Sequence, residues 1–394
     1  MVFRRTFVLF IGLSLMLASC NTKTAMQRAV THDLEVAGVQ LSALTELYDT
    51  ASVFPRSWSD GIYSDKNFKD WTSGFLPGSL WLYAEMSGKE DYADRARRIT
   101  AKLKDIPFYN RTHDLGFMVL CSYGRQWLSD RDSVSREAVI QASKTLIGRF
   151  DPQVGAIRSW DWGDWNYPVI IDNMMNLEML FVASELTGDP VYRDIAVRHA
   201  DKTLENHFRP DASSWHVVSY NNDGTIERKQ THQGYSDDSR WARGQAWGLY
   251  GYTVCYRYTK DSRYIEQACR IAAMIMEAVK TSDAIPYWDY DDPEIPDAPR
   301  DASAAAITAS ALLELQGMVE DAALQKDYTD YATRILSSLS SPEYLAEPLS
   351  NGFFILKHAT GDLPSGVEID AAINYADYYF LEALQRYSDL QRQH

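Results

Sequence analysis

The sequence contains little cysteine, and none of it in the spacing of a zinc or redox motif. Only four cysteines occur in 394 residues, and no two of them form a CxxC pair. This argues against a disulfide framework and a cysteine-based zinc site. Cys121 and Cys255 lie in apolar helical runs and Cys269 in an amphipathic one. We therefore expect all three to be small buried side chains.

Positive charge is also scarce. The chain has 39 Lys and Arg against 54 Asp and Glu, which gives a formal net charge of −15 at pH 7. Such a surface repels polyanions, so nucleic acids and anionic membrane surfaces are disfavoured as partners. A small anionic substrate remains compatible with this charge, but it would need cationic side chains around its site.

After residue 20 no run is long and apolar enough to span a bilayer. Residues 1–20, "MVFRRTFVLFIGLSLMLASC", have the arginines, apolar stretch and small residues of a secretory signal. The "LASC" ending resembles a bacterial lipobox, in which Cys20 would carry the lipid; the alternative is an ordinary signal peptide that contains a cysteine. We expect an exported periplasmic or outer-membrane lipoprotein, attached to the membrane only by that anchor, with residues 21–394 as a single domain.

A weak repeat runs through the chain. A tyrosine is followed four residues later by alanine, just after a Gly or Asp turn, at Tyr92–Ala96, Tyr192–Ala196, Tyr264–Ala268 and Tyr328–Ala332. A degenerate copy has Ala138 and Ala142. The i, i+4 spacing predicts an amphipathic helix for each copy.

More apolar segments alternate with these amphipathic helices. They cover residues 78–88, 115–128, 173–188, 246–259, 307–320 and 377–389. Together with an N-terminal helix around residues 34–48, they give six inner and six outer helices. We therefore predict an all-α fold, an (α/α)6 toroid; an open helical solenoid is the alternative. A hairpin is expected to turn near residues 222–224.

The loops that enter the apolar helices carry the unusual residues. They hold Trp71, His113, Asp114, Trp160, Asp172, His232 and Gln233, among others. If the inner helices run in one direction, these loops gather at one rim of the ring. Aspartate at a helix start is often only an N-cap. Tryptophans beside the carboxylates favour a sugar site instead, because glycoside hydrolysis uses paired carboxylates.

Asp172 stands out because apolar residues flank it on both sides, "PVII" before and "NMMNL" after. Burial and a second carboxylate raise the pKa of such a group, whereas a helix N-terminus lowers it. We expect the first two effects to dominate, so that Asp172 can hold a proton near neutral pH.

Three further candidates have structural alternatives. His216 could be a functional residue or a half-buried strand residue, and His113 could orient Asp114 or merely pack. Arg243, between two tryptophans, is our first choice to hold an anion, although it could instead pair with Asp237 or Asp238. No His or Glu ligand spacing supports a metal at those two aspartates.

Three long motifs, "HDLGFM", "IIDNMMNLEMLFVAS" and "THQGYSDDSRWARGQAWGLYGY", resemble those of the unsaturated glucuronyl hydrolases, glycoside hydrolase family 88. The resemblance implies an (α/α)6 toroid without metal or cofactor. It implies exo-hydrolysis of a 4,5-unsaturated uronic acid from the non-reducing end of lyase-generated oligosaccharides. In that reaction the C4=C5 enol ether is hydrated and the resulting hemiketal collapses.

The resemblance also assigns roles to residues. Asp172 corresponds to the acid/base and Asp114 to the second essential carboxylate. Substrate contacts are implied for Trp71, His113, Trp160, His216, Gln233, Trp241, Arg243 and Trp247. The C-terminal "VEIDAAINYADYYFLEAL" follows the family ending only loosely.

Other functions fit parts of this pattern. An unsaturated rhamnogalacturonyl hydrolase acting on pectin fragments would share the fold and the hydration chemistry. A non-catalytic glycan-binding toroid would keep the tryptophans without needing both Asp114 and Asp172. An epimerase would need rim histidines suited to ring opening, which the sequence does not present.

Overall fold

The structure of the chain is a computed structural model that describes residues 24–392. The predicted signal segment, including Cys20, lies outside the described residues. Within residues 24–392 no helix is both long and apolar enough to cross a membrane.

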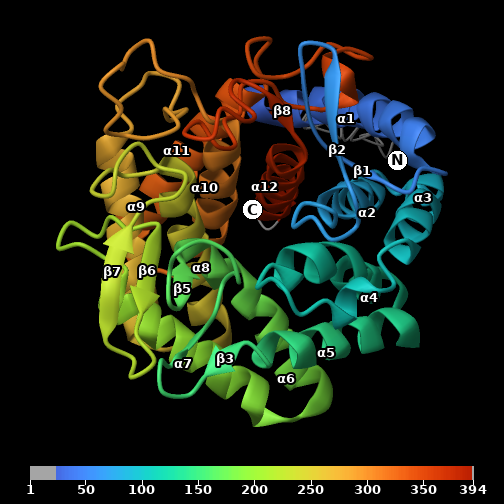
Figure 1. The fold of residues 1–394 in the computed structure, drawn as a ribbon. Coiled ribbons are helices and arrows are strands. Elements are labelled where there is room, and N and C mark those ends of the chain that lie inside the picture. The colour runs from blue at the N-terminus through green and yellow to red at the C-terminus, as the bar shows by residue number, and fades with distance from the viewer. Residues whose placement is uncertain (1–23, 393–394) are drawn as a thin grey trace, which may run out of the picture.

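Helices arranged in two concentric layers make up most of the structure (Figure 1). The outer layer consists of α1 (Ala25–Tyr48), α3 (Glu90–Ala101), α5 (Ser133–Ile147), α7 (Pro190–Asn206), α9 (Ser262–Ala278) and α11 (Ala322–Leu339). The inner layer consists of α2 (Phe75–Ser87), η2 (Gly116–Gly124) with α4 (Arg125–Asp130), η3 (Ile171–Asn176) with α6 (Leu177–Thr187), α8 (Ala242–Thr259), α10 (Ala302–Leu315) and α12 (Asn374–Arg392). The last helix, α12, packs against both α10 and α2, which closes the ring. The predicted (α/α)6 toroid is confirmed, and the open solenoid is excluded.

The Tyr–Ala repeat explains how the outer helices associate. The alanines are fully buried, and each tyrosine is buried beside them. Tyr92 on α3 donates a hydrogen bond to Gly38 O on α1 (2.7 Å). Tyr264 on α9 donates one to Asp201 Oδ1 on α7 (2.8 Å). At these two copies the repeat therefore marks the position where one outer helix contacts the outer helix before it.

Short strands occupy the connections between the helices. They are β1 (Phe54–Ser59), β2 (Ile62–Lys66), β3 (Phe150–Asp151), β4 (Ala156–Ile157), β5 (Pro168–Ile170), β6 (Val217–Tyr220), β7 (Ile226–Gln230) and β8 (Ala372–Ile373); η1 (Ile106–Phe108) and η4 (Asn351–Phe353) are single 3-10 turns. The predicted hairpin is confirmed as β6–β7, with Gly224 at φ 81°. Two of the cysteines, Cys121 and Cys255, are buried as expected, whereas Cys269 is only partly buried.

A second hairpin, β1–β2, was not anticipated from the sequence. Its turn is Asp60–Gly61, with positive φ at both residues (50° and 83°), as a type I′ hairpin requires. Strand β1 also pairs with β8, so that Ser57 faces Ile373. This pairing joins the N-terminal and C-terminal parts of the rim.

Helix α8 contains two glycines three residues apart that make different contacts. A Cβ at Gly251 would lie 2.4 Å from Met174 Cβ, whereas at Gly248 the nearest atom would be 3.6 Å away. We expect Gly251→Ala to lower the free energy of unfolding by about 1–3 kcal/mol through overpacking. Gly248→Ala should leave it unchanged or raise it by up to about 1 kcal/mol through helix propensity. Urea unfolding of both variants measures the difference, and equal effects would contradict the close approach of η3 to α8.

Candidate active site

A cavity of about 400 Å³ opens at the rim where the inner helices begin. Asp114, Asp172 and Arg243 line it together with Trp71 and Trp160. Three larger hollows, of about 710, 700 and 620 Å³, contain neither carboxylate. The loops before the inner helices therefore gather at one place, as the sequence predicts.

Asp172 is not a helix cap. Strand β5 pairs with β6, and the chain then turns directly into η3, where Ile170 holds the N-cap position without any side-chain cap bond. Asp301, by contrast, caps α10 by accepting a hydrogen bond from Ser303 N (3.0 Å). The capping explanation therefore holds for Asp301 and fails for Asp172, which is only 9% exposed.

Burial sets the protonation of Asp172. Loss of hydration raises the pKa of the carboxyl from its usual 3.8 to about 7; Asp114 adds to this rise, and the Arg243 guanidinium opposes it. The expected dominance of desolvation is confirmed. Near neutral pH the carboxyl is thus divided between its acid and base forms, which is the condition for a group that must both donate and accept a proton.

His216 presents a fixed tautomer to Asp172. Its Nδ1 accepts hydrogen bonds from the backbone N–H groups of His232 and Gln233 (both 3.1 Å). Burial holds the pKa of His216 well below its usual value, so the ring is neutral and its proton lies on Nε2. That nitrogen lies 3.6 Å from Asp172 Oδ2. The alternative of a half-buried strand residue is wrong, because His216 precedes β6 and is buried. Its Nε2–H faces the carboxyl from just beyond hydrogen-bond distance.

Asp114 is held by the residues before it. Thr112 Oγ1 donates to Asp114 Oδ2 (2.6 Å), and His113 Nε2 lies 3.2 Å from Asp114 Oδ1. His113 is buried, and this burial lowers its pKa. The predicted orienting contact between His113 and Asp114 is present.

Arg243 has a different partner from the two considered in the sequence. Its Nη1 donates to Asp301 Oδ2 (3.2 Å) and Thr360 O (2.6 Å), and Nη2 donates to Gly361 O (2.5 Å). Pairing with Asp237 or Asp238 is therefore wrong. The guanidinium is 4.6 Å from the ring centre of Trp241, lines the cavity and adds positive charge there. Its contact with a substrate anion stays a prediction.

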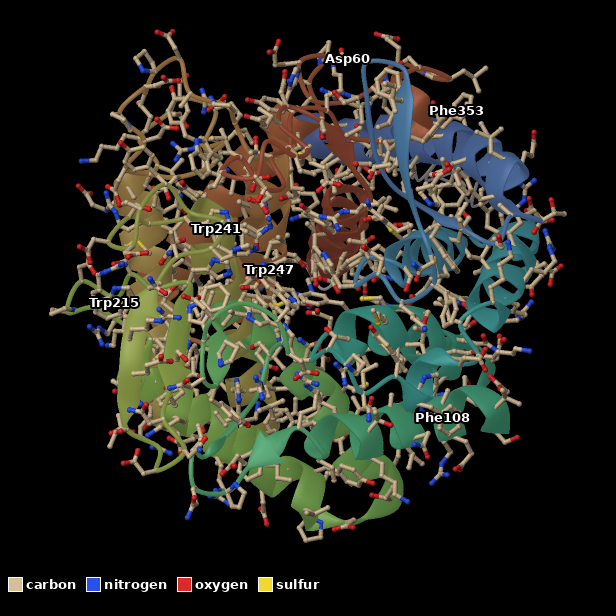
Figure 2. The ribbon with its side chains drawn as sticks, viewed as in Figure 1. Asp60, Phe108, Trp215, Trp241, Trp247 and Phe353 are labelled. Atoms are coloured by element: carbon tan, nitrogen blue, oxygen red, sulfur yellow. The ribbon has the colours of Figure 1, made fainter. Side chains whose placement is uncertain are left out.

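The predicted aromatic residues form two layers. Trp71 and Trp160 line the cavity, and Trp160 stacks on Trp162 with ring centres 4.4 Å apart. Trp241 and Trp247, both labelled in Figure 2, are instead buried, with only 2% and 0% exposed.

The inner layer supports the cavity from behind. Trp241 packs on His216 at 4.5 Å, and Trp247 packs on Phe117 at 5.1 Å. Direct contact of Trp241 and Trp247 with substrate stays a prediction. Gln233 lines the cavity and donates to Gly361 O (3.1 Å).

Comparison with known proteins agrees with this geometry. Residues 49–389 match Glycosyl Hydrolase Family 88. The chain belongs to this family. An unsaturated glucuronyl hydrolase from Formosa agariphila is 45% identical over 397 residues, which cover 97% of this chain and 98% of that protein.

Solved structures of family 88 enzymes are similar along nearly their whole length. The crystal structure of an unsaturated glucuronyl hydrolase specific for heparin has a TM-score of 0.90 at 47% identity, covering 93% of this chain and 98% of that one. A variant of the Streptococcus agalactiae enzyme complexed with dGlcA-GalNAc6S has a TM-score of 0.79 at 30% identity, covering 91% and 92%.

Several lining residues of this family 88 site were missed by sequence reasoning. The cations Arg56, Lys69 and Arg111 face the cavity, and Asp362 reaches it from the C-terminal loop. Arg56 forms an ion pair with Glu368 (2.7 Å). These residues lie outside the three motifs and inside no periodic segment, so nothing in the sequence marked them.

The C-terminal segment that departs from the family pattern braces the rim. Asn374 Nδ2 donates to Pro55 O (2.9 Å) and Thr72 O (3.1 Å). Tyr375 is buried with its ring 5.0 Å from that of Trp71. Both residues therefore hold the loops that carry the site.

The raised pKa of Asp172 predicts a pH-dependent stability. Unfolding restores the ordinary pKa, so between about pH 4 and pH 7 the folded state binds more protons and its stability falls as pH rises. Asp172→Asn removes the free-energy cost of ionising a buried carboxyl. The variant should gain stability relative to the wild type across that range, by at most about 4 kcal/mol, and the gain should level off above pH 7.

Urea unfolding at pH 4.5 and pH 8 measures this gain. The matched control is Asp327→Asn, because Asp327 is an exposed carboxylate on α11. A gain that is the same at both pH values would show that Asp172 is not destabilised by burial.

Proposed function

We propose that the protein is an exo-acting unsaturated glucuronyl hydrolase. It removes a 4,5-unsaturated uronic acid from the non-reducing end of lyase-generated oligosaccharides. The observation that carries this proposal is the buried Asp172, with its pKa of about 7, in one cavity with Asp114. Membership of family 88 and the relatives named for this activity support it.

The geometry suits hydration of an enol ether. The protonated Asp172 carboxyl donates its proton to C4, and positive charge develops at C5 and the ring oxygen. Water then adds at C5 and gives a proton to the Asp172 carboxylate, which restores the acid. The hemiketal opens to a C5 ketone and leaves a hemiacetal at C1. That hemiacetal collapses to an aldehyde, its hydroxyl proton passes to the glycosidic oxygen, and the remaining oligosaccharide is released. One residue thus acts as acid and then as base, as its pKa allows.

The surrounding residues prepare this step. His216 Nε2–H faces Asp172 Oδ2 and can stabilise the carboxylate after proton transfer. The Asp114 carboxylate can stabilise the positive charge that develops on the sugar. Trp71 and Trp160 offer flat surfaces for the unsaturated ring. The cationic side chains that line the cavity offset the repulsion between a negatively charged uronate and this acidic protein.

Glycosaminoglycan fragments are the proposed substrates. Named relatives include the heparin-specific enzyme and an unsaturated chondroitin disaccharide hydrolase of Streptococcus pyogenes, 32% identical over 372 residues. These names favour the glucuronyl over the rhamnogalacturonyl reaction. A non-catalytic glycan-binding toroid would have no need of a desolvated acid such as Asp172. We also propose that residues 1–20 export the protein and that Cys20 carries a lipid anchor.

A panel of unsaturated disaccharides tests the substrate class. Absorbance of the C4=C5 uronate band is followed with disaccharides from heparin, chondroitin and pectin lyases. We expect loss of absorbance with glycosaminoglycan products and none with the pectin product. Loss only with the pectin product would favour the rhamnogalacturonyl alternative, and binding without any loss would favour the non-catalytic one.

The role of Asp172 predicts the pH profile. Because the proton donor must be protonated, kcat/KM should fall as pH rises through about 7. Asp172→Asn should lower kcat by about 10²- to 10⁴-fold, the range of general acid–base catalysis. The exposed variant Asp327→Asn should keep both the rate and the falling limb. A wild-type profile that stays flat up to pH 9 would contradict this role.

A further inference from the structure

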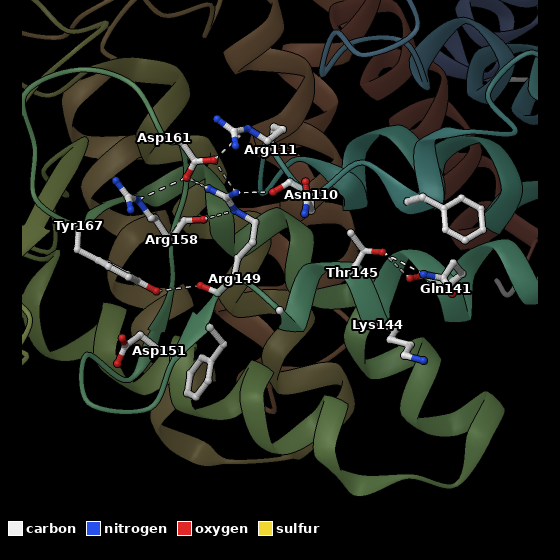
Figure 3. A pocket seen from close by; sticks show the side chains of 13 residues that line it. Asn110, Arg111, Gln141, Lys144, Thr145, Arg149, Asp151, Arg158, Asp161 and Tyr167 are labelled. Carbon is white, nitrogen blue, oxygen red and sulfur yellow. Dashed lines mark hydrogen bonds and ion pairs between the residues drawn. The ribbon is translucent and has the colours of Figure 1, made fainter.

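A second hollow adjoins the catalytic cavity across a single wall of chain. This outer groove, of about 710 Å³, lies between α5 and the loop that carries Asp161 (Figure 3). Residues 108–112 form the wall: Phe108 and Asn110 line the outer groove, whereas Tyr109 lines the catalytic cavity. Arg111 lines both. A ligand that leaves the cavity past Arg111 therefore enters the outer groove.

The outer groove is locally cationic in an acidic protein. Arg111, Lys144, Arg149 and Arg158 line it against two carboxylates, although the chain as a whole carries a net charge of −15. One of those carboxylates, Asp161, is shared by the three arginines at 3.6, 3.0 and 3.6 Å. The four cationic side chains outnumber the two carboxylates, Asp151 and Asp161. The excess positive charge favours an anionic ligand.

An aromatic side chain stands at the same place without a packing role. Phe108 lines the outer groove and is 67% exposed, and it lies toward the outer edge of the ring in Figure 2. A single exposed ring does not by itself mark a binding surface, but Phe108 stands beside the cationic side chains of the outer groove. A ring beside cations suits a sugar unit that carries carboxylate or sulfate.

We propose that the outer groove binds the reducing-end continuation of the substrate oligosaccharide. On this assignment the cavity holds the unsaturated uronate, Arg111 marks the crossing, and Phe108 and Lys144 contact anionic sugar units further along the chain. The inference rests on the proposed function and adds to it a preference for longer anionic oligosaccharides over disaccharides.

Chain-length kinetics test this inference. We compare kcat/KM for an unsaturated disaccharide and an unsaturated hexasaccharide from the same glycosaminoglycan, using wild type, Phe108→Ala and Lys144→Glu. Both residues are exposed, so neither change should disturb folding. Each variant should lower kcat/KM for the hexasaccharide about fivefold, the factor that roughly 1 kcal/mol of binding represents. Values for the disaccharide should stay within about twofold of the wild type.

The matched control is Lys326→Glu on α11, an exposed lysine on another outer helix, which changes the net charge equally. It should leave both substrates unaffected. Equal effects of Phe108→Ala on both substrates, or no effect on either, would contradict oligosaccharide binding in the outer groove. Hydrolysis of the disaccharide would still support the proposed function in that case. Absence of hydrolysis of both substrates by the wild type would overturn the proposed function and this inference with it.

Discussion

The removal of one carboxyl group from water is the constraint on which the site depends. Asp172 keeps a proton near neutral pH because the ring of inner helices closes around it and leaves it little solvent. Closure in turn requires α12 to pack between α10 and α2, and β8 to pair with β1 at the rim. Residues 372–392, at the end of the described chain, thus help to bury a side chain near its middle.

A neutral histidine beside Asp172 lets its pKa stay near neutral pH. A cationic histidine beside Asp172 would lower its pKa, but two backbone N–H groups and burial hold His216 neutral with its proton on Nε2. Arg243 is the nearby cation, and Asp301 together with two backbone carbonyls restrains it. The balance between desolvation and Arg243 places the pKa near 7. The same chain supplies separate cations, such as Lys69, to attract an anionic sugar.

The fold and the place of the site could be predicted from periodicity and from motifs. The Tyr–Ala repeat and the apolar segments predicted the toroid, because burial imposes both patterns, and the loops at helix starts predicted that Asp114 and Asp172 share a cavity. The partner of Arg243 could not be predicted, since Asp301 lies 58 residues away and only the packing of α10 against α8 brings it near. The Asp60–Gly61 hairpin had a usable signal that was overlooked. Lys69 and Arg111 had no such signal, because single cationic residues in loops follow no sequence periodicity.

The protonation state of Asp172 in the resting protein is the central claim, and an infrared or ¹³C carboxyl titration measures it directly. The signal is obtained as the difference between protein labelled at aspartate and the labelled Asp172→Asn variant, without substrate. The account predicts a protonated carboxyl that ionises with a midpoint near pH 7. A midpoint near pH 4, the value of an ordinary exposed aspartate, would contradict it.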